Sequence, residues 1–269
     1  MENKFLQIKN REEWQKLLDK VFFRTFFHLL EWEEFLEREF KWLKFERYIW
    51  NNQALLSLAR VKIGAREKLV SHPFCEYGGP LPLADKVDGK KFADDVLQYF
   101  RDTPFKISFH PMIFNYFDNL PLAEAERETF FFENLDTLSD SEIWDTLDRN
   151  RHRSIKSAQE QDFAVSKCQS ISELKTLYDL YVQNLRQHKA LPYPFSFFSF
   201  FLQNQQAEVM VVKNRSGVIG GNVFLFYDKI AHSFLCGFKK SDKKQGAHSL
   251  VLWATSRDAG EQKHILFLN

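Results

Sequence analysis

Val218-Ile-Gly-Gly-Asn-Val-Phe-Leu-Phe-Tyr227 and Ile230-Ala-His-Ser-Phe-Leu-Cys-Gly-Phe238, joined by Asp228-Lys229, decide the fold class. Both segments are rich in β-branched and aromatic residues, and the polar dipeptide between them is typical of a turn, so the stretch predicts a β-hairpin. The sequence also predicts a strand before the hairpin and a helix and a closing strand after it, at residues 208–213, 246–259 and 264–268. This order predicts a three-stranded antiparallel sheet followed by a β-α-β crossover.

Two helices are predicted upstream of this sheet. Ser170-Ile-Ser-Glu173 fits the capping box that begins a helix, and Leu174, Leu177 and Tyr181 then fall on one helix face. The phenylalanine-rich residues 195–202 are predicted to form the second helix.

The first half of the chain repeats this order. Two helices, three strands, a helix and a strand are predicted at residues 13–21, 31–40, 45–50, 54–63, 68–77, 92–100 and 105–109. Both halves therefore have the order α-α-β-β-β-α-β, although few residues are identical between them. We expect an α/β protein of two modules, residues 1–136 and 137–269, each with a mixed, mostly antiparallel sheet flanked by helices.

The composition is that of a globular protein, with 44% hydrophobic and 27% charged residues among 269. No run of 18 apolar residues predicts a membrane span, and no basic-then-apolar start predicts a signal peptide, so we expect a cytoplasmic protein. Three widely separated cysteines, Cys75, Cys168 and Cys236, are expected to be reduced. The sequence has no spacing of residues typical of a metal site.

Two helices, a three-stranded meander and a β-α-β crossover form the order of the GNAT acyltransferase fold. Four stretches add a closer resemblance, to the FemABX group of tandem-GNAT aminoacyltransferases and their BioF2-like relatives. They are Phe27-His-Leu-Leu-Glu-Trp32, Cys75-Glu-Tyr-Gly-Gly-Pro-Leu81, Arg149-Asn-Arg-His-Arg-Ser-Ile-Lys-Ser-Ala158 and Leu191-Pro-Tyr-Pro-Phe-Ser-Phe-Phe198. The resemblance covers nearly the whole chain.

The resemblance implies an acyltransferase or aminoacyltransferase that joins an activated acyl donor to an amine of a cell-envelope precursor, as in peptidoglycan and cell wall biogenesis. It favours aminoacyl-tRNA as the donor and implies no resident cofactor. Two alternatives remain open. One is an acyl-CoA N-acyltransferase that acts on sugar amines in exopolysaccharide synthesis, and the other is a binding module that kept the GNAT fold and lost the reaction.

The donor site is expected near one degenerate turn. Acetyl-CoA-binding GNAT modules have a Q/R-x-x-G-x-G/A turn whose amides hold pyrophosphate at a helix N-terminus. The corresponding segment, Lys243-Lys-Gln-Gly-Ala-His248, keeps one glycine but begins with lysine and ends with histidine. We expect Gly237, Lys243, Lys244 and Gly246 to bind the donor, and the altered turn favours a donor other than acetyl-CoA.

Substrate binding is expected at a glycine turn, a basic helix and a proline loop, namely Tyr77, Gly78 and Gly79, then Arg149, Arg153 and Lys156, then Tyr193. Glycine in the turn allows a ligand to approach the backbone closely, although a turn alone also favours glycine. The three cations share one helix face and could hold phosphates. The alternative is that they pair with acidic residues just upstream. Some peptidoglycan members have arginine at the position of Tyr193, so this residue favours a different acceptor.

Two histidines are the candidate catalytic bases. His110 follows the strand predicted at residues 105–109, where some relatives have an aspartate near the acceptor amine. His188 lies in the loop before residues 195–202. For both, the alternative is a structural histidine at the end of an element.

The ends of the two modules differ. The first continues from His110 to Asp136 and includes an apolar run, residues 129–135, that is predicted to form a further strand. The second has only Asn269 after residues 264–268. We therefore expect the second module to be truncated, with an unpaired apolar edge along its closing strand and with weak or absent activity.

Overall fold

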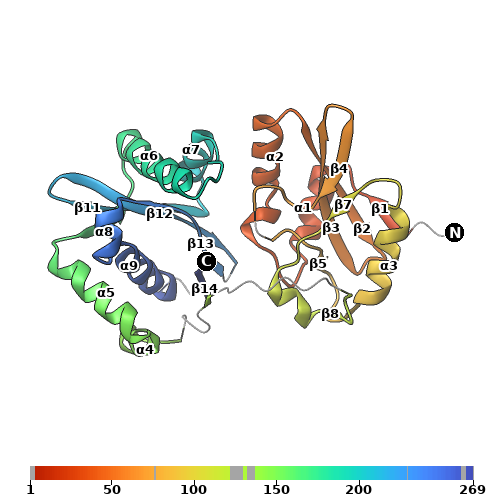
Figure 1. Cartoon of the computed structure of the whole chain (residues 1–269). Coiled ribbons are helices and arrows are strands. Elements are labelled where there is room, and N and C mark those ends of the chain that lie inside the picture. Colours follow the sequence, from red (N-terminus) through yellow and green to blue (C-terminus); the bar gives the residue numbers. More distant parts are fainter. Residues whose placement is uncertain are drawn as a thin grey trace. The chain divides into compact units, whose positions relative to one another are not determined.

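The computed structural model describes residues 4–75, 77–121, 130–131, 137–228, 230–261 and 265–268 (Figure 1). The chain divides into two compact units, Met1–Glu126 and Arg127–Asn269. Each unit is built around a mixed, mostly antiparallel six-stranded sheet with helices beside it. The α/β class predicted from the sequence is confirmed.

The sheet of unit 1 has the order β1-β2-β3-β4-β7, and β5 pairs with the first residues of β3. The closing pair of this sheet, β4–β7, is parallel. The elements are β1 (Phe5–Gln7), α1 (Arg11–Leu18), η1 (Phe26–His28), α2 (Leu30–Glu39), β2 (Leu43–Trp50), β3 (Ala54–Ile63), β4 (Arg66–Val70), β5 (Leu81–Pro82), β6 (Val87–Asp88), α3 (Gly89–Tyr99), β7 (Phe105–Lys106), η2 (Pro111–Asn115) and β8 (Phe117–Asp118). Strands β6 and β8 form a separate parallel pair.

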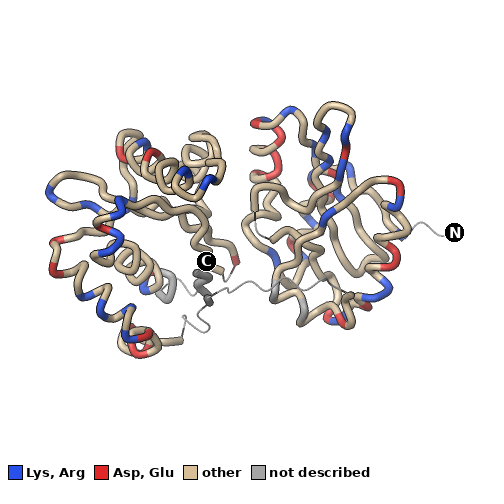
Figure 2. The backbone as a smooth tube through the Cα atoms, viewed as in Figure 1, with Lys and Arg blue, Asp and Glu red and all other residues tan. Residues whose placement is uncertain are grey.

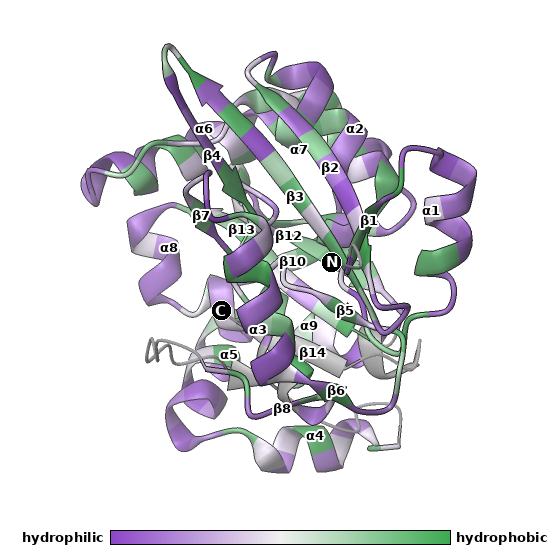
Figure 3. Ribbon diagram, turned by 90° about the vertical axis from the view of Figure 1, so that its right-hand side faces the viewer, coloured by the Kyte–Doolittle hydropathy of each residue, from purple (hydrophilic) through white to green (hydrophobic). Residues whose placement is uncertain are grey.

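Alternation along the strands places helices on both faces of this sheet. On one face, Phe92 of α3 packs with Trp50 and Leu56. On the other face, Trp14 of α1 packs with Leu55, the neighbour of Leu56 in β3. Successive strand residues point to opposite faces, so β3 supplies both cores. The outer side of α3 is hydrophilic (Figure 3).

One carboxylate ties α2 to the sheet of unit 1. Glu33 is 0% exposed. Its Oε2 accepts hydrogen bonds from the Arg47 guanidinium on β2, with the Nε contact at 2.6 Å, and its Oε1 accepts from Ser57 Oγ on β3 at 2.5 Å. A buried charge needs partners of this kind, so Glu33 sets the position of α2 over two strands.

The sheet of unit 2 has the order β10-β11-β12-β13-β14-β9, and only β13–β14 is parallel among its described pairs. The elements are β9 (Phe130–Phe131), α4 (Asp140–Thr146), α5 (Arg149–Glu160), β10 (Ala164–Lys167), α6 (Ile171–Gln187), α7 (Phe195–Gln203), β11 (Ala207–Asn214), β12 (Gly217–Tyr227), β13 (Ile230–Phe238), α8 (Lys240–Lys244), α9 (Ala247–Glu261) and β14 (Ile265–Leu268). Helices α6 and α7 lie on one face, and α5, α8 and α9 on the other (Figure 1).

The predicted unpaired edge of the closing strand is wrong. β14 lies between β13 and β9, with Phe267 opposite Phe131 and Leu268 opposite Phe130. Residues 129–135 were expected to extend the first module, but the strand among them, β9, belongs to unit 2, whose boundary falls at Glu126 instead of Asp136. The apolar edge of β14 obtains its hydrogen-bonding partner from this upstream segment, which local patterning could not reveal.

The anchoring role of Glu33 can be tested on one helix. Glu33→Ala leaves the Arg47 guanidinium and the Ser57 hydroxyl without their acceptor, so we expect the free energy of unfolding to fall by about 3–5 kcal/mol. Its neighbour Glu34 is 41% exposed and pairs with exposed Arg11, so Glu34→Ala should cost about 0–1 kcal/mol. Urea titration of both variants measures the difference, and equal losses would show that Glu33 does not anchor α2.

Candidate functional site

The outer edge of β13 changes partner partway along. β14 pairs in parallel with β13 from Ile230 to Ser233. The register between β12 and β13 shifts at the next residue: Ser233 lies opposite Phe224 and Leu235 opposite Val223, so the strand forms a β-bulge at Phe234. A bulge bends a strand and redirects its side chains. Parallel pairing of the first half of β13 therefore ends where the strand bends.

Beyond the bulge, an asparagine side chain takes the place of a strand. Lys239 N–H donates to the Ile219 carbonyl at 2.9 Å, so the alternating antiparallel ladder turns the backbone groups of Phe238 and Cys236 away from β12. Asn184 on α6 pairs with Phe238: its Nδ2 donates to the carbonyl at 2.9 Å, and its Oδ1 accepts from the N–H at 2.8 Å. In the described registers, no strand lies opposite the N–H of Cys236 on this edge.

Polar side chains gather on the α9-facing side of this edge. Asn222 lies opposite Cys236 and is fully buried. Its Nδ2 donates to Ser233 Oγ at 3.0 Å, whereas its Oδ1 has no hydrogen-bond partner among the described residues. Burial raises the pKa of the Cys236 thiol, and Lys243 opposes this shift. We call residues 234–238 of β13, together with Asn222 and Ser233, the β13 edge site.

Aromatic rings cover the opposite side of the β13 edge site. The Tyr193 ring stacks on Phe197 with centroids 5.0 Å apart and lies 6.2 Å from Phe234. Two tyrosines of α6 fix the loop: Tyr193 N–H donates to Tyr181 Oη at 3.1 Å, and Tyr178 Oη donates to the Tyr193 carbonyl at 3.2 Å. Of the expected substrate residues, Tyr193 therefore lies beside the bulge.

His188 is not brought into this arrangement. It caps the C-terminal end of α6, is exposed, and its imidazole forms no hydrogen bond or ion pair in the portion that the structure describes. Its assignment as a catalytic base stays a prediction.

The four residues expected to bind the donor do not share one environment, because the two glycines pack against protein backbone and the two lysines are exposed. A Cβ at Gly237 would overlap the backbone N of Tyr181, and one at Gly246 would overlap the carbonyl oxygen of Ser154. Protein backbone thus occupies the space that each glycine leaves free, and α5 covers the N-terminus of α9. Lys243 and Lys244 are exposed on α8. Burial, followed by the charge of Lys243, lowers the pKa of nearby His248 to about 4.

The basic helix forms as predicted, over Arg149–Glu160, with Ile155 and Ala158 buried against α9. Arg149, Arg153 and Lys156 are exposed, and blue cations follow the length of α5 in Figure 2. None of the three forms an ion pair with any residue that the structure describes.

The upstream acids have other partners. Asp148 Oδ1 accepts from the N–H groups of Asn150 and Arg151 at the start of α5. Asp140 pairs with Arg257 at 2.5 Å. We call Arg149, Arg153 and Lys156 the cation face of α5. Asp140 and Asp148 do not pair with this face, because their described partners lie elsewhere.

The expected residues of unit 1 form a packed cluster. A Cβ at Gly78 would meet the His72 ring, and one at Gly79 would lie 3.0 Å from the backbone of Phe109. The His110 ring lies 4.6 Å from Tyr77, and its Nδ1 accepts from Met112 N–H at 3.2 Å, as the N-cap of η2. His110 is buried, in the position of a structural cap.

Two histidines that sequence reasoning missed lie side by side, with ring centroids 4.8 Å apart, and one of them, His72, lies close to Glu33. His28 Nε2 donates to the Gly79 carbonyl at 3.2 Å, and burial lowers its pKa to about 4. His72 follows β4 with φ 40°, its Nε2 lies 3.8 Å from Glu33 Oε1, and neither ring nitrogen has a hydrogen bond within the described chain. Burial and then His28 lower the pKa of His72 well below 6.5, while burial raises that of Glu33 to about 7.

Sequence reasoning also missed Asn222 and Ser233. The available signal was the presence of polar residues inside two largely apolar strands, Asn222 in β12 and His232 and Ser233 in β13. The β13 edge site offers an outward N–H at Cys236, and the buried Asn222 Oδ1 on the opposite strand has no hydrogen-bond partner among the described residues. An N–H of this kind can donate to a developing oxyanion, so the arrangement suits acyl transfer.

Within the described ranges, no group of three or more His, Cys, Asp or Glu residues could hold a metal ion. The three cysteines are free thiols. None of the helices in these ranges combines the length and apolar character that crossing a membrane requires.

The sheet of unit 2 closes with a parallel pair beside a β-bulge, in the element order expected of the GNAT acyltransferase fold. No protein-family model and no curated protein sequence matches the chain. The crystal structure of FemX matches with a TM-score of 0.65 and 10% identity, over 98% of this chain and 88% of that one. The structure of L-PGS from Bacillus licheniformis matches with a TM-score of 0.52 and 13% identity, over 97% and 78% of the two chains. The C-terminal domain of a putative lysylphosphatidylglycerol synthetase from Agrobacterium fabrum gives 0.52 and 12%, over 96% and 78%.

The chain has the FemX-like GNAT acyltransferase fold. The resemblance carried by four short sequence stretches is therefore confirmed at the level of the fold. At 10–13% identity the comparisons show the fold alone.

The closure of the α9 N-terminus predicts unequal costs for two glycine substitutions. Gly246 and Gly217 have φ angles of 92° and 109°, so alanine strains both backbones by about 1–3 kcal/mol. Only at Gly246 does the Cβ also meet the Ser154 carbonyl, whereas nothing lies within 4 Å at Gly217. We expect Gly246→Ala to lower the free energy of unfolding by about 1–3 kcal/mol more than Gly217→Ala, measured by urea titration. Equal costs would mean that α5 does not cover this helix end.

His72 predicts a pH dependence of stability. It is neutral in the folded protein, whereas the unfolded chain binds a proton below about pH 6.5, so the stability present above that pH is lost as the pH falls. In His72→Phe this loss is absent. As the pH falls below 6.5, the free energy of unfolding of His72→Phe relative to that of the wild type should therefore rise by up to about 1.4 kcal/mol per pH unit. Urea titrations at pH 7.5, 6.5 and 5.5 measure it, with His188→Phe as an exposed control. Parallel curves for His72→Phe and the wild type would contradict the assignment.

Proposed function

We propose that this chain is an aminoacyltransferase of the cytoplasm, which joins the aminoacyl group of an aminoacyl-tRNA to an amine of a cell-envelope precursor. The FemX-like fold supports an acyl transfer reaction. The observation that carries the choice of donor is the cation face of α5, because transfer RNA is a polyanion and an acyl group alone needs no such surface.

The cations expected to bind phosphate in unit 2 lie on two helices, α5 and α8. Arg149, Arg153 and Lys156 project from α5 without described ion-pair partners. Lys243 and Lys244 belong to α8, and Gly246, two residues further on, contacts the Ser154 backbone of α5. Arginine binds phosphate through two parallel hydrogen bonds, so the combined surface suits a nucleic-acid backbone.

The same contact disfavours coenzyme A as the donor. Pyrophosphate binding at a helix N-terminus requires open backbone N–H groups. Here the backbone of α5 lies against Gly246, immediately before α9 begins at Ala247. A donor without a pyrophosphate at this position fits the closed helix end.

The β13 edge site supplies the groups that the reaction needs. The acceptor amine attacks the ester carbonyl carbon, the new C–N bond forms, and the C–O bond to the terminal ribose breaks. The N–H of Cys236 would donate to the oxyanion between these steps. The amine loses one proton to water, and the ribose oxygen takes up one proton as it leaves.

Transfer RNA binding should depend on the cation face. Arg149→Ala, Arg153→Ala and Lys156→Ala combined should weaken binding of a pool of charged tRNA at least tenfold. The slope of log K against log salt should fall by about 2–3, because each lost phosphate contact changes it by about 0.7–0.9. Filter binding between 50 and 200 mM NaCl measures both, and transfer of radiolabelled amino acids from the charged tRNA to a panel of amine acceptors, amino sugars and UDP-muramyl pentapeptide among them, measures the reaction.

A matched control removes three exposed cations elsewhere, by combining Lys62→Ala, Arg66→Ala and Lys68→Ala on unit 1, and should leave binding within twofold of the wild type. Equal losses of tRNA affinity in both triple variants would contradict a specific role of α5 in tRNA binding. Acyl transfer from an acyl-CoA without tRNA binding would overturn the proposed donor. Tight tRNA binding without transfer to any amine would support the non-catalytic module instead.

A further inference from the structure

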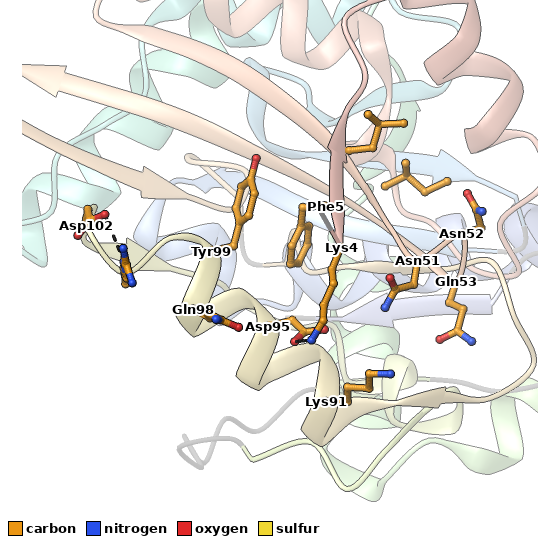
Figure 4. Close-up of a pocket in the computed structure, with 13 residues that line it drawn as sticks. Lys4, Phe5, Asn51, Asn52, Gln53, Lys91, Asp95, Gln98, Tyr99 and Asp102 are labelled. Atoms are coloured by element: carbon orange, nitrogen blue, oxygen red, sulfur yellow. Dashed lines mark hydrogen bonds and ion pairs between the residues drawn. The ribbon is translucent and has the colours of Figure 1, made fainter. Parts of the chain in front are cut away.

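Unit 1 contains a separate polar groove of about 1120 Å³ between β1, the β2–β3 turn and α3 (Figure 4). All its lining residues lie between Lys4 and Asp102, so it belongs to unit 1 alone. Pockets for small ligands commonly have volumes of 300–1,000 Å³, so this groove can accept several sugar or amino-acid units. The β13 edge site, in unit 2, does not include it.

Buried contacts hold the floor of the groove. Asp95 on α3 is 5% exposed. Its Oδ1 accepts from Lys4 Nζ at 2.6 Å and its Oδ2 from Trp50 Nε1 at 3.0 Å. These bonds connect α3 to β1 and β2, the elements that form opposite sides. The groove is therefore formed before any ligand enters, which lowers the entropy cost of binding.

Four amide side chains line the rim and have no hydrogen-bond partner among the described residues. Asn51, Asn52 and Gln53 form the β2–β3 turn, and Gln98 lies across from them on α3. No hydrogen bond to another described residue involves these side-chain amides. Each amide offers two donor hydrogens and an accepting oxygen, which suits ligand groups that both donate and accept. Hydroxyl groups have this property.

The charges in the groove largely compensate each other. Lys4 pairs with Asp95, and Arg101 pairs with Asp102 at 3.5 Å. Of the lining residues, Lys91 is left as the one cation without a described partner. An anionic ligand such as RNA would require a larger excess of cations. The groove therefore favours a neutral ligand.

Apolar surface is also exposed beside the amides. Tyr99 is 42% exposed and packs on the buried Phe5 ring with centroids 5.1 Å apart. Leu6 on β1 is 61% exposed. A pyranose ring has apolar C–H faces and hydroxyl edges, so aromatic and aliphatic patches between amides match both parts of a sugar.

We infer that the groove between β1, the β2–β3 turn and α3 binds a neutral oligosaccharide chain. This site is independent of the proposed transfer reaction and of the cation face of α5. It would hold a glycan on unit 1 whatever the donor proves to be.

Titration of the full chain with neutral tetrasaccharides tests the inference. Chitotetraose, maltotetraose and cellotetraose are added up to 10 mM, and binding is followed by NMR shifts and by calorimetry. At least one should bind, and Gln53→Ala combined with Gln98→Ala should weaken that binding at least tenfold, because two sets of hydrogen bonds are lost. Asn51 and Asn52 are kept, because their left-handed backbone (φ 47° and 55°) favours asparagine.

Gln159→Ala combined with Gln187→Ala removes two exposed amides from unit 2 and is the matched control. It should leave the dissociation constant within twofold, and the thermal midpoints of both double variants should equal that of the wild type. The inference is overturned if no tetrasaccharide binds at 10 mM, if the Gln53 and Gln98 variant binds as tightly as the control, or if tetra-alanine competes for the groove. None of these readouts involves amide transfer, so failure of the proposed reaction leaves the test intact.

Discussion

Pairing of the backbone groups of β13 is the constraint on which unit 2 depends. A buried strand needs partners on both edges, because unpaired N–H and C=O groups in the interior cost free energy. β12 pairs with one edge on both sides of the bulge, whereas the other edge is shared between β14, up to Ser233, and the Asn184 amide at Phe238. The bulge at Phe234 lies between the segment that pairs with β14 and the residue that pairs with Asn184. Backbone can remain available to a ligand only at such a transition, which is why the candidate chemistry lies there.

Local patterns in the sequence were sufficient for the elements but not for their long-range partners. The apolar stretches of residues 218–238 predicted β12 and β13, and the capping box at Ser170 predicted α6. The pairing of Phe131 with Phe267 joins residues far apart in the chain, and periodicity carries no such information. Glu33 is one of several glutamates in α2, and nothing local distinguishes it from the others. Its burial depends on Arg47 and Ser57, which only the fold brings together.

Glycines were the weakest guide to the site. Gly78, Gly79, Gly237 and Gly246 were all taken as places where a ligand approaches the backbone. In the structure each faces protein: the His72 side chain, the backbone of Phe109, the backbone of α6 and a carbonyl of α5. A glycine indicates that another group lies close to the backbone, but it does not indicate whether that group is a ligand or another part of the protein. The polar residues inside strands, Asn222 above all, were not used, because the burial of this amide and the missing partner of its oxygen among the described residues are seen only in the fold.

The position of β14 also has a consequence for the order of folding. It follows every other described strand in the chain, yet it lies between β13 and β9, so the sheet of unit 2 stays divided until β14 enters. Contacts between residues this far apart close large loops and form slowly. During synthesis, β9 would emerge from the ribosome long before β14, and it would stay unpaired with β14 until that strand is made. A chaperone that shields short apolar strands would have most to act on during that interval, and a fragment starting at residue 137 would lack β9 altogether.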